Sequence, residues 1–335
     1  MKNTKILSLI MALLMTLSLF AFTSCSSKDQ NDTPNVNEEN KPEKIRVITL
    51  AGPTGMGMAK LIDDNKNKTT KYNYEFTVSS DPQQVSPEVI KGNYDIAAVP
   101  VNLASTLFNK TEGKLKVAGI NTLGVLYMLE NGDTINQVSD LKGKTIHATG
   151  QGSNPEFVLR YILQKNNIDP DKDVNIIFLT DHAELAAKLK AGEVEIGMLP
   201  EPQVTVATMG NDKTRIALNL TEEWDKISEY DLVQGCIIVN NEFAEKYPEA
   251  LKGFLDEYKY SVDYVNNTVD LASNLIESAG IVPKAAIAKK AIPNCNICLI
   301  TGNEMKESVK QMLEVLFSFD TKSIGGKLPG DEFYY

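Results

Sequence analysis

Residues 91–100 read KGNYDIAAVP, and residues 191–200, one hundred positions later, read AGEVEIGMLP. Aligned without a gap, the two stretches share a glycine, an isoleucine and a closing proline: Gly92 with Gly192, Ile96 with Ile196, and Pro100 with Pro200. A glycine followed by a short apolar run is typical of a helix end that leads into a buried strand. The repeat therefore predicts a chain with two halves built in the same way.

The alignment extends backwards to residues 44 and 144 without a gap. In each copy a β-branched run stops at a glycine, Gly52 or Gly152, and apolar residues with helical spacing follow. The next strand of each copy ends at an aspartate, Asp81 or Asp181, a residue type that commonly caps a helix N-terminus. Each copy thus predicts the order β-α-β-α-β, and right-handed crossovers make such a unit a mainly parallel sheet flanked by helices.

The expected fold class is α/β with two lobes and a ligand cleft between them, because open parallel sheets bind ligands at the carboxyl ends of their strands. The C-terminal third contains no third copy of the repeat. Its helical segments are expected to complete the first lobe. They are 241–267, with a break or kink near Pro248, 268–279, and 304–319, which has Met305, Val309, Met312 and Leu316 on one face. A single large sheet is the alternative architecture. The expected lobes are 44–124 with 236–335, and 125–235.

The composition bounds the class of protein. The chain has 335 residues, 42% of them hydrophobic, which is enough for a large core and more than one domain. Its formal net charge is -10, and a nucleic-acid partner would require a basic face. We therefore expect no nucleic-acid partner.

The N-terminus has the pattern of an export signal. Lys2 and Lys5 precede an apolar run over residues 6–22, which is short for a membrane span. The run ends LFAFTSCSS, which resembles the bacterial lipoprotein signal, and this resemblance implies lipidation of Cys25 after removal of residues 1–24. Phe22 stands where that signal usually has leucine, so cleavage and release of the chain is the alternative. Residues 25–43 are nearly free of apolar side chains and are expected to be a flexible tether.

The remaining cysteines and the two histidines do not predict a redox centre or a metal site. Cys236 lies in an apolar run, and the CxxC pair Cys295 and Cys298 precedes a strand pattern rather than opening a helix. The chain has only two histidines, His147 and His182, too few to complete a metal site with that pair. We expect no metal and no cofactor, and we leave open whether the CxxC pair forms a disulfide.

Four stretches carry a family resemblance: YDIAAVPVNLAS, EIGMLPEPQVTVA, VNNEFAEKYPEALKGFLDEY and IGGKLPGDEFYY. Together with the signal and tether, they resemble the nitrate, sulfonate and thiamine-pyrimidine group of type II substrate-binding proteins of bacterial ABC importers. The resemblance covers about residues 44–335. It implies hinged lobes that close on a small molecule and present it to permease subunits, in a monomer anchored on the extracytoplasmic face of the cell membrane.

The strand ends supply the candidate ligand residues. The first group follows the first strand of each half and contains helix N-termini, which attract anions: Gly52, Thr54, Gly55 and Met56 in one half, and Gly152, Ser153 and Asn154 in the other. Ser153 and Glu156 also have the spacing of a capping box, which is the structural alternative for Ser153.

Three more candidates are side chains that suit a polar heterocycle. Asn102 can donate and accept hydrogen bonds, and Glu201 could pair with an amine or an aminopyrimidine. Trp224, the only tryptophan, could provide a stacking surface beside the cleft, or it could be packed at a domain edge. The absence of a nearby arginine argues against an anion, so the sequence favours a small polar heterocycle over a sulfonate-like or nitrate-like anion.

Two other functions use the same fold. One is an enzyme resembling the synthases that make the thiamine pyrimidine with a cofactor-linked lysine, a histidine and a cysteine cluster, a set that this sequence does not match. The other is a sensory lipoprotein without a transporter. A solute-binding protein without catalytic residues is the function we expect.

Overall fold

A computed structural model describes residues 41–335 of the chain. The predicted signal segment, the predicted lipidation site Cys25 and most of the predicted tether lie outside the described residues. Within residues 41–335 no helix is long and apolar enough to cross a membrane.

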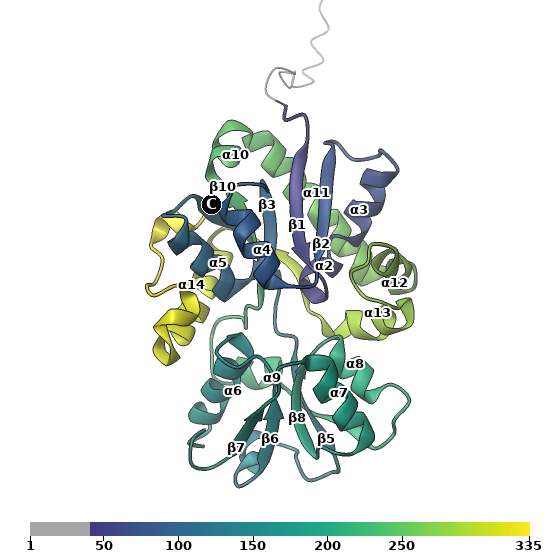
Figure 1. The fold of residues 1–335 in the computed structure, drawn as a ribbon, viewed down its shortest axis with the longest axis vertical. Coiled ribbons are helices and arrows are strands. Elements are labelled where there is room, and N and C mark those ends of the chain that lie inside the picture. Colours follow the sequence, from purple (N-terminus) through teal and green to yellow (C-terminus); the bar gives the residue numbers. More distant parts are fainter. Residues whose placement is uncertain (1–40) are drawn as a thin grey trace, which may run out of the picture. The chain divides into compact units, whose positions relative to one another are not determined.

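The described residues contain two β-sheets (Figure 1). Sheet A has the order β11-β4-β10-β3-β1-β2. Its strands are β1 (Ile45–Leu50), β2 (Tyr74–Ser79), β3 (Ile96–Pro100), β4 (Leu115–Thr122), β10 (Gly235–Asn240) and β11 (Ile297–Ile300). Sheet B has the order β7-β6-β8-β5-β9. Its strands are β5 (Leu126–Asn131), β6 (Thr145–Ala148), β7 (Asn175–Phe178), β8 (Ile196–Pro200) and β9 (Thr214–Asn219).

The predicted repeat is confirmed element by element. In the first copy, the helices between the strands are α2 (Pro53–Met56), α3 (Ala59–Lys66) and α4 (Pro82–Ile90), and in the second they are α6 (Asn154–Lys165) and α7 (His182–Ala191). Asp81 and Asp181 cap α4 and α7 by accepting hydrogen bonds from the N–H groups of Gln83 and Glu184. In each copy the three repeat strands pair in parallel, while the added strands are antiparallel, so each sheet is mixed. The two-lobed α/β fold class is confirmed.

The two sheets are joined through their antiparallel strands. Residues 123–125 connect β4 to β5, and the chain returns from β9 through α9 (Leu220–Asp225) and residues 226–234 to β10. The first residue of β5, Leu126, pairs with Pro200 at the end of β8, and the first residue of β10, Gly235, pairs with Pro100 at the end of β3. Both crossings therefore enter at the carboxyl edge of a parallel strand. The expected lobe boundaries follow these crossings closely and stay a prediction.

The remaining helices cover the sheets. They are α5 (Val101–Lys110), α8 (Gln203–Thr208), α10 (Asn241–Lys246), α11 (Pro248–Asn267), α12 (Val269–Ser278), α13 (Ala285–Ala291) and α14 (Gly302–Phe319). Short 3₁₀ turns lie at Val138–Leu141, Ile292–Asn294, Thr321–Ile324 and Asp331–Phe333. The predicted break near Pro248 is confirmed as the boundary between α10 and α11, and the predicted apolar face of α14 is buried.

One apolar core runs through parts of both halves. It includes Ile48 and Val99 from sheet A, Met128 and Ile146 from sheet B, and Leu232 from the return crossing. The helix α14 extends this core, because it packs on α5 and β4 of one half and on α6 of the other. At its end, Phe319 stacks on Phe157 of α6 with ring centroids 5.8 Å apart. The two halves are therefore joined by packing as well as by the crossings.

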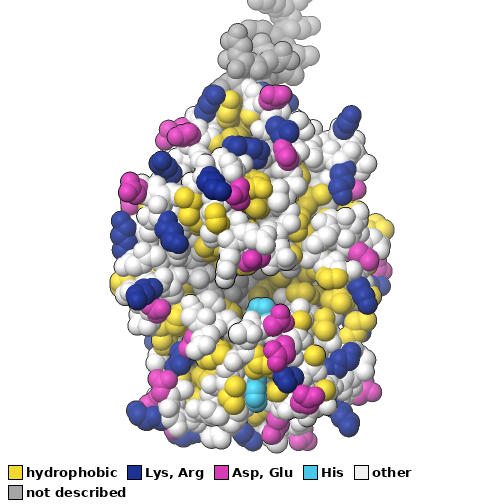
Figure 2. Space-filling model, viewed as in Figure 1, with side chains coloured by type: hydrophobic (Ala, Val, Ile, Leu, Met, Phe, Trp, Pro, Cys, Tyr) yellow, Lys and Arg dark blue, Asp and Glu magenta, His cyan; other side chains and the backbone are white. Residues whose placement is uncertain are grey.

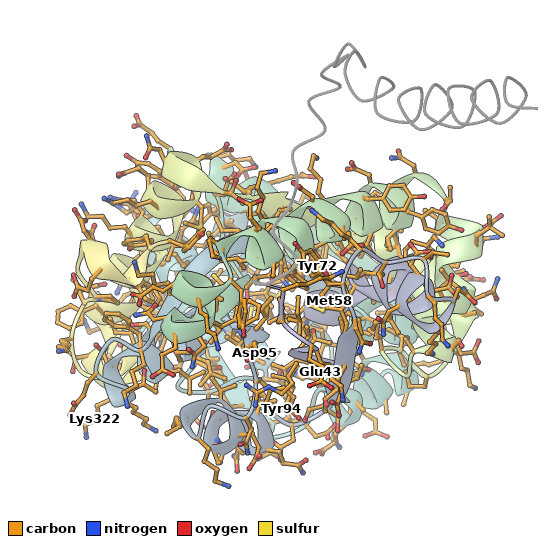
Figure 3. The ribbon with its side chains drawn as sticks, turned by 90° about the horizontal axis from the view of Figure 1, so that it is seen from above. Glu43, Met58, Tyr72, Tyr94, Asp95 and Lys322 are labelled. Carbon is orange, nitrogen blue, oxygen red and sulfur yellow. The ribbon has the colours of Figure 1, made fainter. Side chains whose placement is uncertain are left out.

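A half-buried ion pair between Arg46 and Asp95 lies at the amino edge of sheet A, at the opposite end of the strands from the crossings. Asp95, which is labelled in Figure 3, precedes β3. Its carboxylate accepts hydrogen bonds from the backbone N–H of Arg46 and from Nε of the Arg46 side chain, at 2.8 and 3.0 Å. The carbonyl of Arg46 accepts from the N–H of Asp95. This pairing holds β1 and β3 in register.

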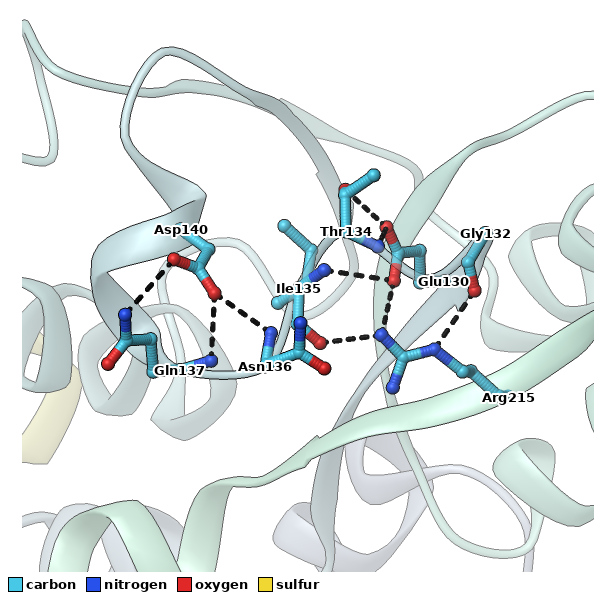
Figure 4. A network of polar contacts seen from close by, with 8 residues as sticks. All are labelled: Glu130, Gly132, Thr134, Ile135, Asn136, Gln137, Asp140 and Arg215. Atoms are coloured by element: carbon cyan, nitrogen blue, oxygen red, sulfur yellow. Dashed lines mark hydrogen bonds and ion pairs between the residues drawn. The ribbon is translucent and has the colours of Figure 1, made fainter.

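A buried carboxylate organises the far end of sheet B (Figure 4). Glu130 at the end of β5 is 0% exposed and lies 2.7 Å from Nη2 of Arg215 on β9. Its carboxylate also accepts from the hydroxyl and N–H of Thr134 and from the N–H of Ile135. Burial alone would raise the pKa of Glu130, but these hydrogen bonds and the guanidinium outweigh it and lower that pKa.

Replacing Arg215 should destabilise the fold, because the buried carboxylate of Glu130 would lose its cation. Arg215→Met leaves Glu130 without its cation, so we expect the free energy of unfolding to fall by about 3 kcal/mol in urea titrations. As a control, Lys91→Met removes an exposed pair with Glu88 and should change stability by less than about 1 kcal/mol. Equal, small effects for the two variants would contradict this account.

The first crossing depends on a glycine. A Cβ placed on Gly124 would lie 2.0 Å from Oγ1 of Thr221 and 3.0 Å from Cδ2 of Leu232, which belongs to the second crossing. Gly124→Ala should therefore destabilise the protein by about 1–3 kcal/mol in thermal or urea unfolding. Adding Thr221→Ala removes the nearest atom and should restore part of the loss. Additive effects of the two substitutions would show that the crossings are not in contact.

Candidate functional site

The candidate site lies where the carboxyl edges of the two sheets approach each other. Both crossings attach at these edges, so the segments after β1, β3, β6 and β8 are held close together. One hydrogen bond joins the edges directly, because Glu201 accepts from Nδ2 of Asn294 at 3.2 Å. Gly52 also lies near Pro202, since a Cβ added to Gly52 would be 4.0 Å from Cδ of Pro202. Figure 2 shows the surface hollowed between the two halves, with carboxylate side chains at the margins of the hollow.

The sheet A edge is formed by the turn after β1. Gly52 has φ 85°, which favours glycine, and its N–H donates to the carbonyl of Ile281 at 3.0 Å. Thr54 is half-buried, and its carbonyl accepts from Nδ2 of Asn121 at 2.9 Å. Gly55 and Met56 are buried, since a Cβ on Gly55 would lie 2.4 Å from the carbonyl oxygen of Leu50. Gly52 and Thr54 are thus the members of this segment that reach the surface of the edge.

Asn102 lies in the first turn of α5 and is half-buried. The turn is attached to the second crossing, because the N–H of Val101 donates to the carbonyl of Gln234 at 3.0 Å. The structure therefore places Asn102 at the same edge as Gly52 and beside the residues that lead into β10.

The sheet B edge contains the turn before α6. The expected capping box is wrong, because the Ser153 hydroxyl donates to the carbonyl of Gly150 at 2.7 Å instead of capping the helix. Glu156 accepts from the N–H of Gly152 and from Nε of Arg160, both at 2.7 Å. Gly152 is exposed and Ser153 is half-buried.

Asn154 is the first residue of α6 and is only 3% exposed. Neither Nδ2 nor Oδ1 of its amide has a hydrogen-bond partner within the described residues. Native proteins rarely leave a buried amide unpaired, so this side chain requires a partner from outside the chain or an explanation.

Glu201 is buried, at 2% exposure, rather than open at the rim. Its carboxylate accepts from the N–H and the hydroxyl of Thr205, both at 3.1 Å, and from Asn294. Burial raises the pKa of Glu201, and these hydrogen bonds offset only part of that rise. Nearby, the hydroxyl of Tyr127 on β5 donates to the carbonyl of Asn294 at 2.9 Å. Glu201 and Tyr127 therefore join sheet B to the 3₁₀ turn before β11 of sheet A.

Trp224 is placed in the core and not beside the hollow. It is 1% exposed, its ring packs on Tyr161 with centroids 5.0 Å apart, and Nε1 donates to the carbonyl of Tyr230 at 2.7 Å. This packing leaves the indole no free face for a ligand. The alternative weighed from the sequence, a tryptophan packed at a domain edge, describes it better.

Sequence reasoning missed several residues of the two edges. Gln203 begins α8, Thr221 lies in the first turn of α9, and Gln234 immediately precedes β10. Each has a buried side-chain atom without a hydrogen-bond partner in the described residues. All three residues lie directly after or before a strand end, as Asn102 does. The sequence could therefore have identified them as candidate ligand residues on the same ground.

The described residues do not form a recognisable catalytic or metal centre. No group of three or more His, Cys, Asp or Glu within residues 41–335 is arranged to hold a metal.

Cys236, Cys295 and Cys298 are free thiols, so the CxxC pair is not a disulfide. Burial raises the pKa of the Cys298 thiol to about 12 and that of Cys295 well above its ordinary value, which keeps both unreactive. His182 lies 2.6 Å from the Thr149 hydroxyl through Nδ1.

Known structures share this architecture. An ABC transporter protein from Parabacteroides distasonis has a TM-score of 0.74 and 23% identity, covering 88% of this chain and 99% of that one. The periplasmic aliphatic sulphonate binding protein SsuA from Escherichia coli has a TM-score of 0.69 and 16% identity, covering 87% and 93%. The nitrate-binding protein NrtA from Synechocystis has a TM-score of 0.56 and 12% identity, covering 84% of each chain. At these identities, the likeness establishes the fold.

Sequence comparison adds the family. A curated relative, "Putative binding protein YtlA" from Bacillus subtilis, is 26% identical over 185 residues, 43% of this chain and 54% of YtlA. The match thus spans about half the length of that relative. The sequence model described as NMT1/THI5 like matches residues 75–270, more than half of the chain. The chain therefore belongs to the NMT1/THI5-like family.

Proposed function

We propose that the chain is the solute-binding component of an ABC importer, which captures a small polar molecule and delivers it to permease subunits in the membrane. The family, the name of YtlA and the solute-binding neighbours in structure support this function. The observation that carries it is the approach of the carboxyl edges of the two sheets, between which the chain makes two crossings.

This arrangement converts binding into closure. A solute that touches both edges is bound most tightly when the lobes, 44–124 with 236–335 and 125–235, are closed. Binding then shifts the equilibrium of the hinge, and the permease can distinguish the loaded protein from the empty one. No bond in the solute has to change.

The proposed ligand residues come from both edges. Gly52, Thr54 and Asn102 belong to the sheet A wall, and Gly152, Ser153 and Asn154 belong to the sheet B wall. Glu201 contributes a negative charge next to the sheet B wall and a contact between the halves. Gly55, Met56 and Trp224 support the walls from the core. The solute that fits this set is a small polar heterocycle, with a sulfonate-like or nitrate-like anion as the alternative.

The location follows from the N-terminal segment. Removal of residues 1–24 and lipidation of Cys25 would attach the chain to the extracytoplasmic face of the membrane as a monomer. Two acyl chains anchor a protein stably, whereas one gives only marginal binding. Residues 25–43 would then act as the tether between the membrane and the lobes.

Two other functions remain alternatives. A synthase of the THI5 type shares the family, but this sequence does not match the cofactor-linked lysine, histidine and cysteine cluster of such an enzyme. A sensory lipoprotein would bind a solute in the same way without feeding a permease. Stimulation of ATP hydrolysis by a reconstituted permease would separate an importer component from a sensor.

Thermal unfolding of the purified full-length chain with small molecules tests the proposed function. We expect one compound to raise the melting temperature progressively with its concentration, through about 2.7 kcal/mol of added stability at one hundred times its dissociation constant. Mass spectrometry should recover that compound unchanged. Formation of a product at a rate proportional to protein concentration would identify an enzyme.

The buried Glu201 predicts a specific pH dependence. An acid whose pKa is raised in the folded state stabilises the fold most below its ordinary pKa, near 4.5, and this contribution is lost as the pH rises through the folded value. The stability of the wild type relative to Glu201→Gln should therefore fall between pH 4.5 and pH 8 in urea unfolding. The exposed Glu195 is the control, because Glu195→Gln makes the same chemical change at the surface of the same half. If the stability of the wild type relative to Glu201→Gln is constant or rises with pH, the burial of the Glu201 carboxylate without a cation is contradicted.

A further inference from the structure

Buried polar atoms without partners concentrate at the two facing edges. Five of the nine such side-chain atoms in the described residues belong to these edges, and Asn154 contributes two of them. The other three are Oε1 of Gln203, Oγ1 of Thr221 and Nε2 of Gln234. Asn154, Gln203 and Thr221 follow strands of sheet B, and Gln234 lies at the start of β10 in sheet A. Both walls of the candidate site thus contain unpaired groups.

An unpaired buried polar group costs about 1–3 kcal/mol, which folded proteins normally avoid. The residue with the clearest case is Asn154, since its side chain is 97% buried and both ends of its amide are free. It also begins a helix of twelve residues, whose first N–H groups add donors at the same point. These groups are suited to a solute that replaces the missing partners.

The unpaired groups are mostly primary amides, and this determines the chemistry of the solute. An amide presents a donor and an acceptor side by side, so it is matched by a group that also donates and accepts. An oxyanion can only accept, and it would leave Oδ1 of Asn154 and Oε1 of Gln203 unpaired against its own negative charge.

The charges at the two edges also argue against an anionic solute. The segments that follow or precede the facing strand ends are 51–56, 79–84, 100–103, 149–156, 179–184, 200–205, 219–225 and 230–235. They contain no lysine and no arginine, and their carboxylates are Asp81, Glu156, Asp181, Glu184, Glu201, Glu222, Glu223, Asp225 and Asp231. Three of these nine carboxylates are paired with cations, Glu156 with Arg160, Glu184 with Lys188 and Glu223 with Lys226. A bound anion would therefore still lie where carboxylates outnumber cations.

We propose that the solute is a neutral or cationic molecule with adjacent hydrogen-bond donors and acceptors, bound through the amide of Asn154, and is not an oxyanion. This inference rests on the proposed solute-binding function and narrows the class of its solute. Gln203 and Thr221 extend the same wall, and Gln234 contacts the solute from the opposite wall when the lobes are closed.

Two series of probes test the class of solute on the purified full-length chain. One series contains nitrate, sulfate and methanesulfonate as sodium salts, with sodium chloride as the ionic-strength control. The other contains neutral and cationic compounds with adjacent donors and acceptors, including cytosine, nicotinamide and benzamidine. We expect a member of the second series to raise the melting temperature progressively with its concentration, and no member of the first series to raise it beyond the chloride control.

Substitution of Asn154 tests the residue without requiring the natural solute. Asn154→Leu keeps the side-chain size and removes the unpaired amide, so the ligand-free chain should melt about 2–4 °C higher. The same variant should bind the active probe at least about tenfold more weakly. Asn131→Leu is the matched control in the same half, because the Asn131 amide is fully paired with Leu189, Val194 and Thr214. That control should lower the melting temperature.

Each contrary outcome has a distinct meaning. Saturable binding of an oxyanion, weakened by Asn154→Leu, would overturn the class of solute and leave the proposed function in place. Destabilisation of the ligand-free chain by Asn154→Leu to the same extent as by Asn131→Leu would overturn the assignment of the Asn154 amide to the solute. The absence of any concentration-dependent rise in melting temperature with both series would overturn the proposed function and this inference together.

Discussion

The antiparallel insertion of β5 and β10 is the constraint on which the rest of the structure depends. An antiparallel strand has to begin at the carboxyl edge of its parallel neighbour, so both crossings leave and enter at the edges where open sheets bind ligands. The prolines that close the two copies of the repeat, Pro100 and Pro200, pair with the first residues of these strands. The repeat and the crossings thus belong to one topology. Sheet B contains β5, which the chain enters from sheet A, and sheet A contains β10, which the chain enters from sheet B.

The polar contacts at the edges follow from this topology. Glu201 lies directly after Pro200, close enough to the first crossing for its N–H to donate to the carbonyl of Val125. Its carboxylate reaches Asn294, which the chain supplies from a distant part of the sequence. The result is a site whose sheet B wall combines a buried charge, a contact with the other half and an unpaired amide. Under the proposed function, a solute bound there would meet hydrogen-bond acceptors and amide groups.

The parts of the fold that depend on local pattern could be predicted from the sequence. The strands of both copies, the aspartate caps of α4 and α7 and the break at Pro248 depend on spacing and on residue type within a few positions. The environment of the site residues could not be predicted, because it depends on distant partners. Glu201 is buried by Asn294 and the crossing, Trp224 packs on Tyr161, and Ser153 bonds to a turn carbonyl instead of capping a helix. In each case tertiary contacts overrode a reasonable local expectation.

The position of α14 has a consequence for how the protein can move. This helix and its terminal Phe319 attach to α6 along one flank, while the crossings attach the halves at the back of the edges. Separation along that flank would expose the stacked rings of Phe157 and Phe319 to water. The halves also meet where α13 packs on α8. Any hinge motion of the proposed lobes would therefore have to separate packed side chains at both helix pairs.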